Sequence, residues 1–580
     1  MKHKVPIIIS GIGILCWFRI LFLKGIWWDD WAWVWHYFGS KDLSEFIVPF
    51  KSLRHELDAC FLYANFKLLD ILPALATSIW SAGKFIIFIL NSVLLYFISS
   101  RVLDKRSLLP AAIAIVYLTS PIVHNLCLVE LCRRVYMTVF LLSVLLSLYS
   151  ISGEKVKLPY YLSALALAFI SMAGLESFIF FEMARPVLVL YVLSGVAKHD
   201  LMKVLKKTFF YWLPFAILGA LILIWRVGLL SPRTGVYAHV YDIKRSPLPE
   251  YMNFVFFGYM NSCLNLFGSY VLNFDNWASR IFKDPFLILQ SIIVAITAAF
   301  IIFGGKKRKV GGAADPGLCR EARQATIFGA FLIIIGLFPH VLSRGGYESG
   351  IESRHGLLAC VGVSVFMPSL FFLLYYKGLI RAFSLYSLLS AAVLLGTIQC
   401  NIAVKAYDND WEQQRSFWRQ FAQRVPDIKD KTCLLVDMPR EEGSYLGGWR
   451  GSYEFAGPLN LLYAKSRAGE EINNHFAESL DVEYDERTGF LYVINIKMGE
   501  GEMRFETFKG TQSYCPRNLI VTYYRKGHLS LNDEIKTAAV GNIGPESLLS
   551  YTAKDQILHE KRASAFPFRW IVLGSAYQKT

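Results

Sequence analysis

The sequence predicts a polytopic α-helical membrane protein with about eleven transmembrane helices and a C-terminal soluble α/β or mostly-β domain. Of its 580 residues, 54% are hydrophobic and only 18% are charged, whereas about 25% of the residues in a soluble globular protein are charged. Many segments also approach the roughly 20 apolar residues that a helix needs to cross a bilayer. These two features predict a chain that is mostly embedded in a membrane.

The net charge of +15 does not indicate a nucleic-acid partner. The basic residues cluster between the apolar runs, for example at Lys105-Arg106 and at Lys306–Lys309, as the positive-inside rule expects of cytoplasmic loops. No segment interleaves basic and aromatic residues in the manner of a nucleic-acid groove. We therefore expect membrane lipids, and no nucleic acid, around this chain.

The apolar runs predict where the chain crosses the membrane, and the basic clusters between them predict which side each loop faces. The bounds of the apolar runs are 5–23, 79–100, 107–122, 136–151, 159–175, 177–194, 210–230, 284–304, 324–343, 355–376 and 382–403. If the N-terminus is cytoplasmic, every basic cluster falls inside, provided that residues 232–283 stay outside. A helix pair within that stretch would raise the count to thirteen. Either odd number sends the C-terminal region to the outer side.

Two domains follow from this pattern. Residues 1–403 form the membrane domain, which includes an outer loop, 24–77, with amphipathic helices that lie along the surface. Residues 404–580 form the C-terminal domain, which is large enough to bury a core of its own. Four of its aromatic residues, Trp411, Trp418, Trp449 and Tyr453, are candidates for stacking on a glycan, with core packing as the alternative role.

Several common machineries are missing from the sequence. It contains no GxxxxGK[ST] phosphate loop, no HExxH zinc motif and no GxSxG nucleophile elbow. Two similar halves, which many secondary transporters show, are not evident either. These absences argue against an ATP-driven pump of the phosphate-loop type, a zinc protease and a serine hydrolase.

The first candidate site is an aspartate pair, Asp29-Asp30, within the aromatic stretch Trp27–Trp35 just after the first span. Acidic residues at such depths usually have a function, although solvation of the loop is the alternative. A carboxylate there could accept the proton of an acceptor hydroxyl. The reference pKa of Asp is about 3.9, so aspartate is a weak base and suits a reaction at a strongly electrophilic centre. An anomeric carbon whose phosphate leaving group departs is such a centre.

The second candidate site is the loop from Pro339 to His355, which faces the same side in the predicted topology. It contains Arg344, Arg354 and His355 among several glycines. Arginine offers a bidentate fork to phosphate oxygens, so these residues could hold a lipid-linked phosphate. Helix capping and interfacial anchoring are the alternative roles.

A third set of residues is predicted on the same outer face. Its members are Glu130, Arg133 and Arg134 in an outer loop, Glu176 at a span end, and Arg54, His55 and Glu56 in the first outer segment. Glu182 and Arg185 lie deeper, at a spacing that lets the two charges neutralise each other. A divalent metal stays an open question, since carboxylates alone can hold one.

These features together resemble the GT-C superfamily of integral-membrane glycosyltransferases, which use polyprenyl-phosphate-linked sugars. The resemblance rests on the Asp29-Asp30 pair directly after the first span, the surface-lying helices and the distal outer domain. Weaker matches are Arg134, Glu176 and the Ser353-Arg354-His355 run, where the histidine stands in place of a more usual aromatic residue. Bacterial members that modify O-antigen and other envelope glycans are most similar in size.

The resemblance implies an inverting transfer from a polyprenyl-phosphate sugar donor to a glycan acceptor on the periplasmic face of the cell inner membrane. No cofactor is implied. Asp29 or Asp30 would be the base, Arg344 or Arg354 would bind phosphate, and Glu130 or Glu176 would bind sugar hydroxyls. Arg134, Arg54, His55 and His355 would line the same site. The alternative functions are a polysaccharide ligase or polymerase, and a transporter of lipid-linked sugars.

Overall fold

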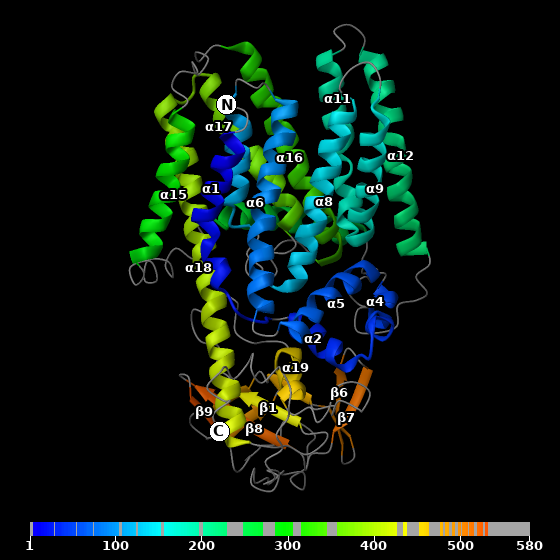
Figure 1. Cartoon of the computed structure of the whole chain (residues 1–580), viewed down its shortest axis with the longest axis vertical. Helices are drawn as coiled ribbons and strands as arrows, with labels where there is room; N and C mark the ends of the chain where they lie inside the picture. The colour runs from blue at the N-terminus through cyan, green and yellow to red at the C-terminus, as the bar shows by residue number, and fades with distance from the viewer. Residues whose placement is uncertain are drawn as a thin grey trace.

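Long helices form most of the computed structural model, and the described strands all lie in the C-terminal region (Figure 1). The structure describes residues 4–27, 29–53, 55–72, 75–103, 107–122, 126–151, 156–196, 201–228, 248–270, 285–304, 315–344, 356–425, 433–437, 452–462, 476–479, 482–485, 490–493, 497–499, 502–507, 510–514, 519–525 and 528–531.

The helices of the bundle follow the apolar runs of the sequence. They are α1 (Lys4–Trp17) with its 3-10 continuation η1 (Phe18–Phe22), α6 (Ala76–Val102), α7 (Leu109–Leu118), α8 (Leu128–Ser150), α9 (Leu158–Gly174), α10 (Ser177–Phe181), α11 (Ala184–Val196), α12 (Leu201–Gly228), α13 (Leu248–Gly268), α15 (Pro285–Gly304), α16 (Pro316–Arg344), α17 (Leu357–Tyr376) and α18 (Ala382–Arg424).

Among the described residues, eight helical segments are long and apolar enough to cross a membrane. They are Val5–Phe22, Ala76–Val102, Leu128–Ser150, Ser177–Ser194, Leu201–Trp225, Pro316–Val341, Leu357–Tyr376 and Ala382–Arg424. Three shorter apolar helical segments, Leu109–Leu118, Leu158–Gly174 and Ile288–Ala298, accompany them. The expected polytopic helical membrane architecture is therefore confirmed at this level.

One predicted boundary was wrong in a way that matters for the site. The span expected at 136–151 begins eight residues earlier, because α8 starts at Leu128. Glu130, Arg133 and Arg134 therefore lie in the first two turns of a helix, and not in the loop where the sequence pattern placed them. The charged residues of this segment masked the start of the helix in a hydropathy pattern.

Four short helices follow the first span. They are α2 (Asp29–Gly39), α3 (Leu43–Phe46), α4 (Val48–Leu53) and α5 (Glu56–Ile71), and α2, α4 and α5 lie across one end of the bundle (Figure 1). The face of α5 that packs inward carries Leu62, Phe66 and Leu69 at helical spacing. Tyr37 of α2 donates a hydrogen bond of 2.6 Å to Asp70 of α5, which ties these helices together.

Helix α18 joins the bundle to the C-terminal region, into which it extends as one continuous element of 43 residues (Figure 1). There the strands β2 (Phe476–Ser479), β1 (Cys433–Asp437), β8 (Leu519–Arg525) and β9 (His528–Leu531) form one sheet in that order. β1 is parallel to β2 and β8, and β9 is antiparallel to β8.

The other described strands form two small antiparallel sheets. One pairs β3 (Val482–Asp485) with β4 (Phe490–Val493), and the other orders β5 (Lys497–Gly499), β6 (Glu502–Thr507) and β7 (Gly510–Tyr514). Helix α19 (Ser452–Leu462) packs between the four-stranded sheet and α2. At that contact Gly457 lies so close to the carbonyl of Trp31 that a Cβ atom added to it would be 2.9 Å from the carbonyl oxygen. Helix α19 therefore packs directly on α2.

Helices α16 and α17 pack with their backbones unusually close. A Cβ atom added at Gly336 would lie 2.7 Å from the backbone nitrogen of Ala359, and one added at Gly329 would lie 2.5 Å from that of Phe366. Small residues permit such approach between membrane helices, where packing replaces the hydrophobic effect as the driving force.

We expect Gly336→Leu to destabilise the protein by about 3 kcal/mol, because overpacking forces two backbones apart. The apparent melting temperature of the full chain in detergent would report the loss. Gly11→Leu in α1 is the matched control, since nothing lies within 4 Å of its Cβ position. Equal melting temperatures for the two variants would contradict the close contact.

Candidate functional site

The carboxylate of Asp30 caps the start of α8. Its Oδ2 accepts a hydrogen bond of 2.6 Å from the backbone amide of Leu128, and its Oδ1 accepts one of 3.0 Å from that of Val129. The first amides of a helix lack partners within the helix and attract negative charge. Asp30, which is only 2% exposed, therefore holds the start of α2 against the start of α8.

Asp29 begins α2, one residue before Asp30. Its backbone is described, whereas its side chain lies outside the described part of the chain. Asp30 uses both of its carboxylate oxygens to accept hydrogen bonds from backbone amides. Asp29 is the residue before it, at the first position of α2.

A buried lysine that the sequence reasoning missed lies beside Asp30. Lys84 stands on α6 two turns from its start, and its side chain is 3% exposed. Its ammonium lies close enough to Asp30 and Arg134 for their charges to act on it, and it stands 5.3 Å from the ring centroid of Trp27. Among the described residues, Lys84 makes no hydrogen bond and no ion pair. A lone lysine inside an apolar span was the available signal, because intramembrane charges are costly.

The start of α8 adds further charges. Oε1 of Glu130 accepts a hydrogen bond of 2.8 Å from Arg133, while its buried Oε2 has no hydrogen-bond partner among the described residues. The guanidinium of Arg134 lies 3.9 Å from the ring centroid of Phe88, and the charge of Glu130 acts on it. We call Asp30, Lys84, Glu130, Arg133 and Arg134 the charged cluster.

Helix α18 provides an aromatic wall beside this cluster. The ring of Tyr407 packs edge-on against Trp27 at 5.3 Å, its carbonyl accepts a hydrogen bond from the indole of Trp27, and its hydroxyl accepts one from the amide of Leu126. Trp411 packs against Trp27 in the same wall, whereas Trp418 is buried further along α18 against Phe455 of α19. For Trp411 and Trp418 the structure shows core packing, and not an exposed stacking surface for a glycan.

The other predicted site residues are placed less fully. His55 precedes α5, and its Nδ1 lies 3.1 Å from Oδ2 of Asp58. Asp58 acts electrostatically on Tyr136 of α8, so α5 packs beside the N-terminal half of that helix. Glu176 is half-buried just before α10. Arg344 ends α16, where only its backbone is described. Arg54, Arg354, His355 and Trp449 lie outside the described residues, as does the side chain of Tyr453.

The pair Glu182 and Arg185 is separate from the charged cluster. Arg185 is bonded to both carboxylate oxygens of Glu182, and its remaining donors reach the carbonyl and the hydroxyl of Ser143 on α8. The predicted neutralisation within the membrane is therefore confirmed. Since all of its bonds are internal to the bundle, the pair has a packing role.

Metal ligands do not gather in this part of the structure. Within the described ranges, no group of three or more His, Cys, Asp or Glu residues has a geometry that could hold a metal ion. The charged cluster is instead rich in cations, with Lys84, Arg133 and Arg134 against the two carboxylates of Asp30 and Glu130. A cluster of this composition can bind an anion beside a hydrogen-bond acceptor.

Comparison with protein-family models, with curated proteins and with solved structures found no match to this chain.

Proposed function

We propose that this protein is an integral-membrane glycosyltransferase that moves a sugar from a polyprenyl-phosphate donor to an envelope glycan such as O-antigen. The observation that supports it best is Lys84, a buried amine that makes no hydrogen bond or ion pair with a described residue and lies near Asp30 and Arg134. An unpaired buried charge is expensive, and an anionic ligand would offset that cost. A lipid phosphate at the end of a membrane bundle is an anion of the required kind.

In the proposed reaction an acceptor hydroxyl attacks the anomeric carbon from the face opposite the phosphate. The proton of the hydroxyl passes to a carboxylate, the bond from the anomeric carbon to the phosphate oxygen breaks, and polyprenyl phosphate leaves with the electron pair. The configuration at the anomeric carbon inverts. Because the leaving group departs as an anion, cations must stabilise it and no general acid is needed.

The residues divide these roles between them. Asp29 is the proposed base, since both oxygens of Asp30 already accept backbone amides. Lys84 and Arg134 are the proposed phosphate ligands, which adds Lys84 to the residues expected from the sequence. The unpartnered Oε2 of Glu130 is suited to accept a sugar hydroxyl. Arg344 and Arg354 remain proposed as additional phosphate ligands. His55 and Glu176 remain proposed as residues that contact the sugar.

The proposal includes a topology. We place the N-terminus in the cytoplasm and the charged cluster at the periplasmic face of the inner membrane, together with the C-terminal domain. A mixed sheet with α19 against it supports an α/β type for that domain. The count of eleven spans requires α7, α9 and α15 to cross as well, and α13 to stay within the outer side.

The test is sugar transfer by the full chain in proteoliposomes, assayed with a panel of polyprenyl-phosphate hexoses and pentoses. We expect Asp29→Asn to reduce transfer about 100-fold or more, the scale of a lost general base. The exposed Asp42, which caps α3 in the same outer segment, provides the control Asp42→Asn, which should retain transfer. Full activity of Asp29→Asn would eliminate the base assignment. A transporter would move the donor across the bilayer and leave its sugar attached.

A further inference from the structure

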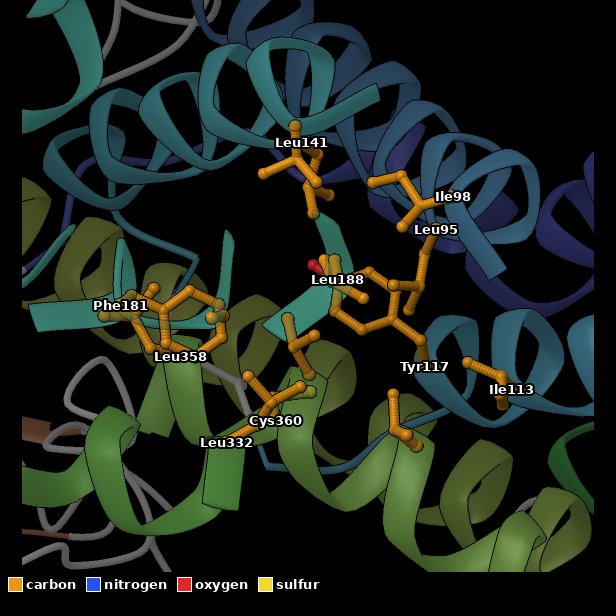
Figure 2. Close-up of a cluster of buried hydrophobic side chains, with 14 of the residues drawn as sticks. Leu95, Ile98, Ile113, Tyr117, Leu141, Phe181, Leu188, Leu332, Leu358 and Cys360 are labelled. Carbon is orange, nitrogen blue, oxygen red and sulfur yellow. The ribbon is translucent and has the colours of Figure 1, made fainter. Parts of the chain in front are cut away.

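A cavity of about 500 Å³ lies inside the bundle. Its lining is almost entirely apolar and comes from α6, α7, α8, α11, α16 and α17. Figure 2 shows the buried side chains of this region, among which Leu95, Ile98, Leu141, Leu188 and Leu332 line the cavity. A space of this size is typical of a small-molecule site.

Among the described lining residues of the cavity, the exposed ones lie on α11 and α16. They are Val187 at 39% and Ser194 on α11, and Ile327 at 64% on α16. Both helices are candidate membrane spans, so their exposed faces meet lipid. The opening between α11 and α16 therefore faces the hydrocarbon of the bilayer, where a lipid chain can enter sideways.

Two arginines flank this opening. Arg320 and Arg323 are exposed near the start of α16, just before the lining residue Gln324. Arg320 acts electrostatically on Tyr191, another lining residue, as does the neighbouring Glu321. Neither arginine forms a hydrogen bond or an ion pair with another described residue. Long basic side chains at a span end reach the headgroup level, and basic pockets between membrane helices bind anionic headgroups.

We propose that the cavity binds one acyl chain of an anionic phospholipid, whose phosphate lies on Arg320 and Arg323. If a carbon atom takes about 30 Å³, as a water molecule does in the liquid, the space holds on the order of 15 carbon atoms, close to one acyl chain. From Gln324 to Leu332 the wall of α16 rises about 12 Å into the bundle. The site thus matches a lipid in both its apolar and its charged part.

The same geometry separates this lipid from the proposed sugar donor. Along α6, Leu95 at the cavity is eleven residues from Lys84, which corresponds to about 16 Å. None of the five residues of the charged cluster lines the cavity. The inference therefore stands independently of the glycosyltransferase proposal.

The experiment is native mass spectrometry of the full chain titrated with phosphatidylglycerol and with phosphatidylcholine. We expect the first bound phosphatidylglycerol to be favoured about tenfold, and Arg320→Gln with Arg323→Gln to reduce it to the level of phosphatidylcholine. Ile327→Trp should fill the opening and weaken both lipids. The controls are Lys377→Gln, an exposed charge at the end of α17, and Ile334→Trp, an exposed α16 residue outside the cavity.

Three outcomes would overturn the proposal. The first is equal binding of the two lipids by the wild-type chain. The second is an equal loss in the control variants, which would mean that any surface change weakens binding. The third is displacement of phosphatidylglycerol by undecaprenyl phosphate at lower concentration, which would assign the cavity to the donor. None of these readouts depends on sugar transfer.

Discussion

Replacing Lys84 by methionine should reduce sugar transfer at least tenfold and at the same time stabilise the protein. The ammonium is buried and makes no hydrogen bond or ion pair with a described residue. Its attraction to Asp30 and to the ring of Trp27 offsets only part of its desolvation cost, and methionine, of similar length and apolar, removes that cost. We expect a gain on the order of 1 kcal/mol in stability, seen as a higher apparent melting temperature of the full chain.

The same substitution removes a cation from the proposed phosphate site. Charge-assisted bonds to phosphate contribute about 1.5–3 kcal/mol each, so we expect undecaprenyl phosphate to bind roughly 10- to 100-fold more weakly and sugar transfer to fall at least as far. Lys24→Met, at an exposed lysine after the first span, is the control and should change neither quantity. Normal phosphate binding in Lys84→Met would remove the observation that supports the proposed function best.

Replacing Asp30 by asparagine should have the opposite effect on stability. The asparagine can offer only one oxygen to the two amides that begin α8, and it lacks the negative charge that the helix start and Lys84 favour. We expect a loss of about 2–3 kcal/mol, from one amide left without its acceptor and from the lost charge. The apparent melting temperature should fall by several degrees.

Because Asp30 positions the start of α8, its loss should also move Glu130 and Arg134 and thereby reduce transfer. Asp30→Asn is then expected to lower stability and activity together, and its KM for the donor should rise. Asp408→Asn, at an exposed ion pair with Lys405, serves as the control. A variant at Asp30 that melts like the wild type would show that the two amide bonds contribute little.

Local composition was sufficient for part of this picture. The apolar runs predicted the helical membrane class because a bilayer requires long apolar segments whatever their partners are. The Asp29-Asp30 pair was conspicuous for the same reason, since charge at a membrane surface stands out against its neighbours. The pairing of Glu182 with Arg185 followed from a spacing of three within one predicted span, which needs no tertiary information.

Other features depended on contacts between distant segments. Asp30 meets the amides of Leu128 and Val129 across about a hundred residues of sequence, and no local pattern distinguishes it from Asp29. Arg134 was expected in a loop because charged residues lower the hydropathy of the first turns of α8. Packing against α6, α5 and α2 stabilises this segment as a helix, and a local sequence pattern contains no information about that packing.

By itself, the sequence determined that this chain is a helical membrane protein with an acidic pair just beyond its first span. The tertiary structure decided which charges meet. It placed Lys84 beside Asp30 and Arg134, turned one aspartate into a helix cap, and left an apolar cavity open to lipid between α11 and α16. The physical reason is that hydropathy is a property of each residue and its neighbours in the sequence. Burial, charge pairing and cavities, in contrast, arise only between segments that folding brings together.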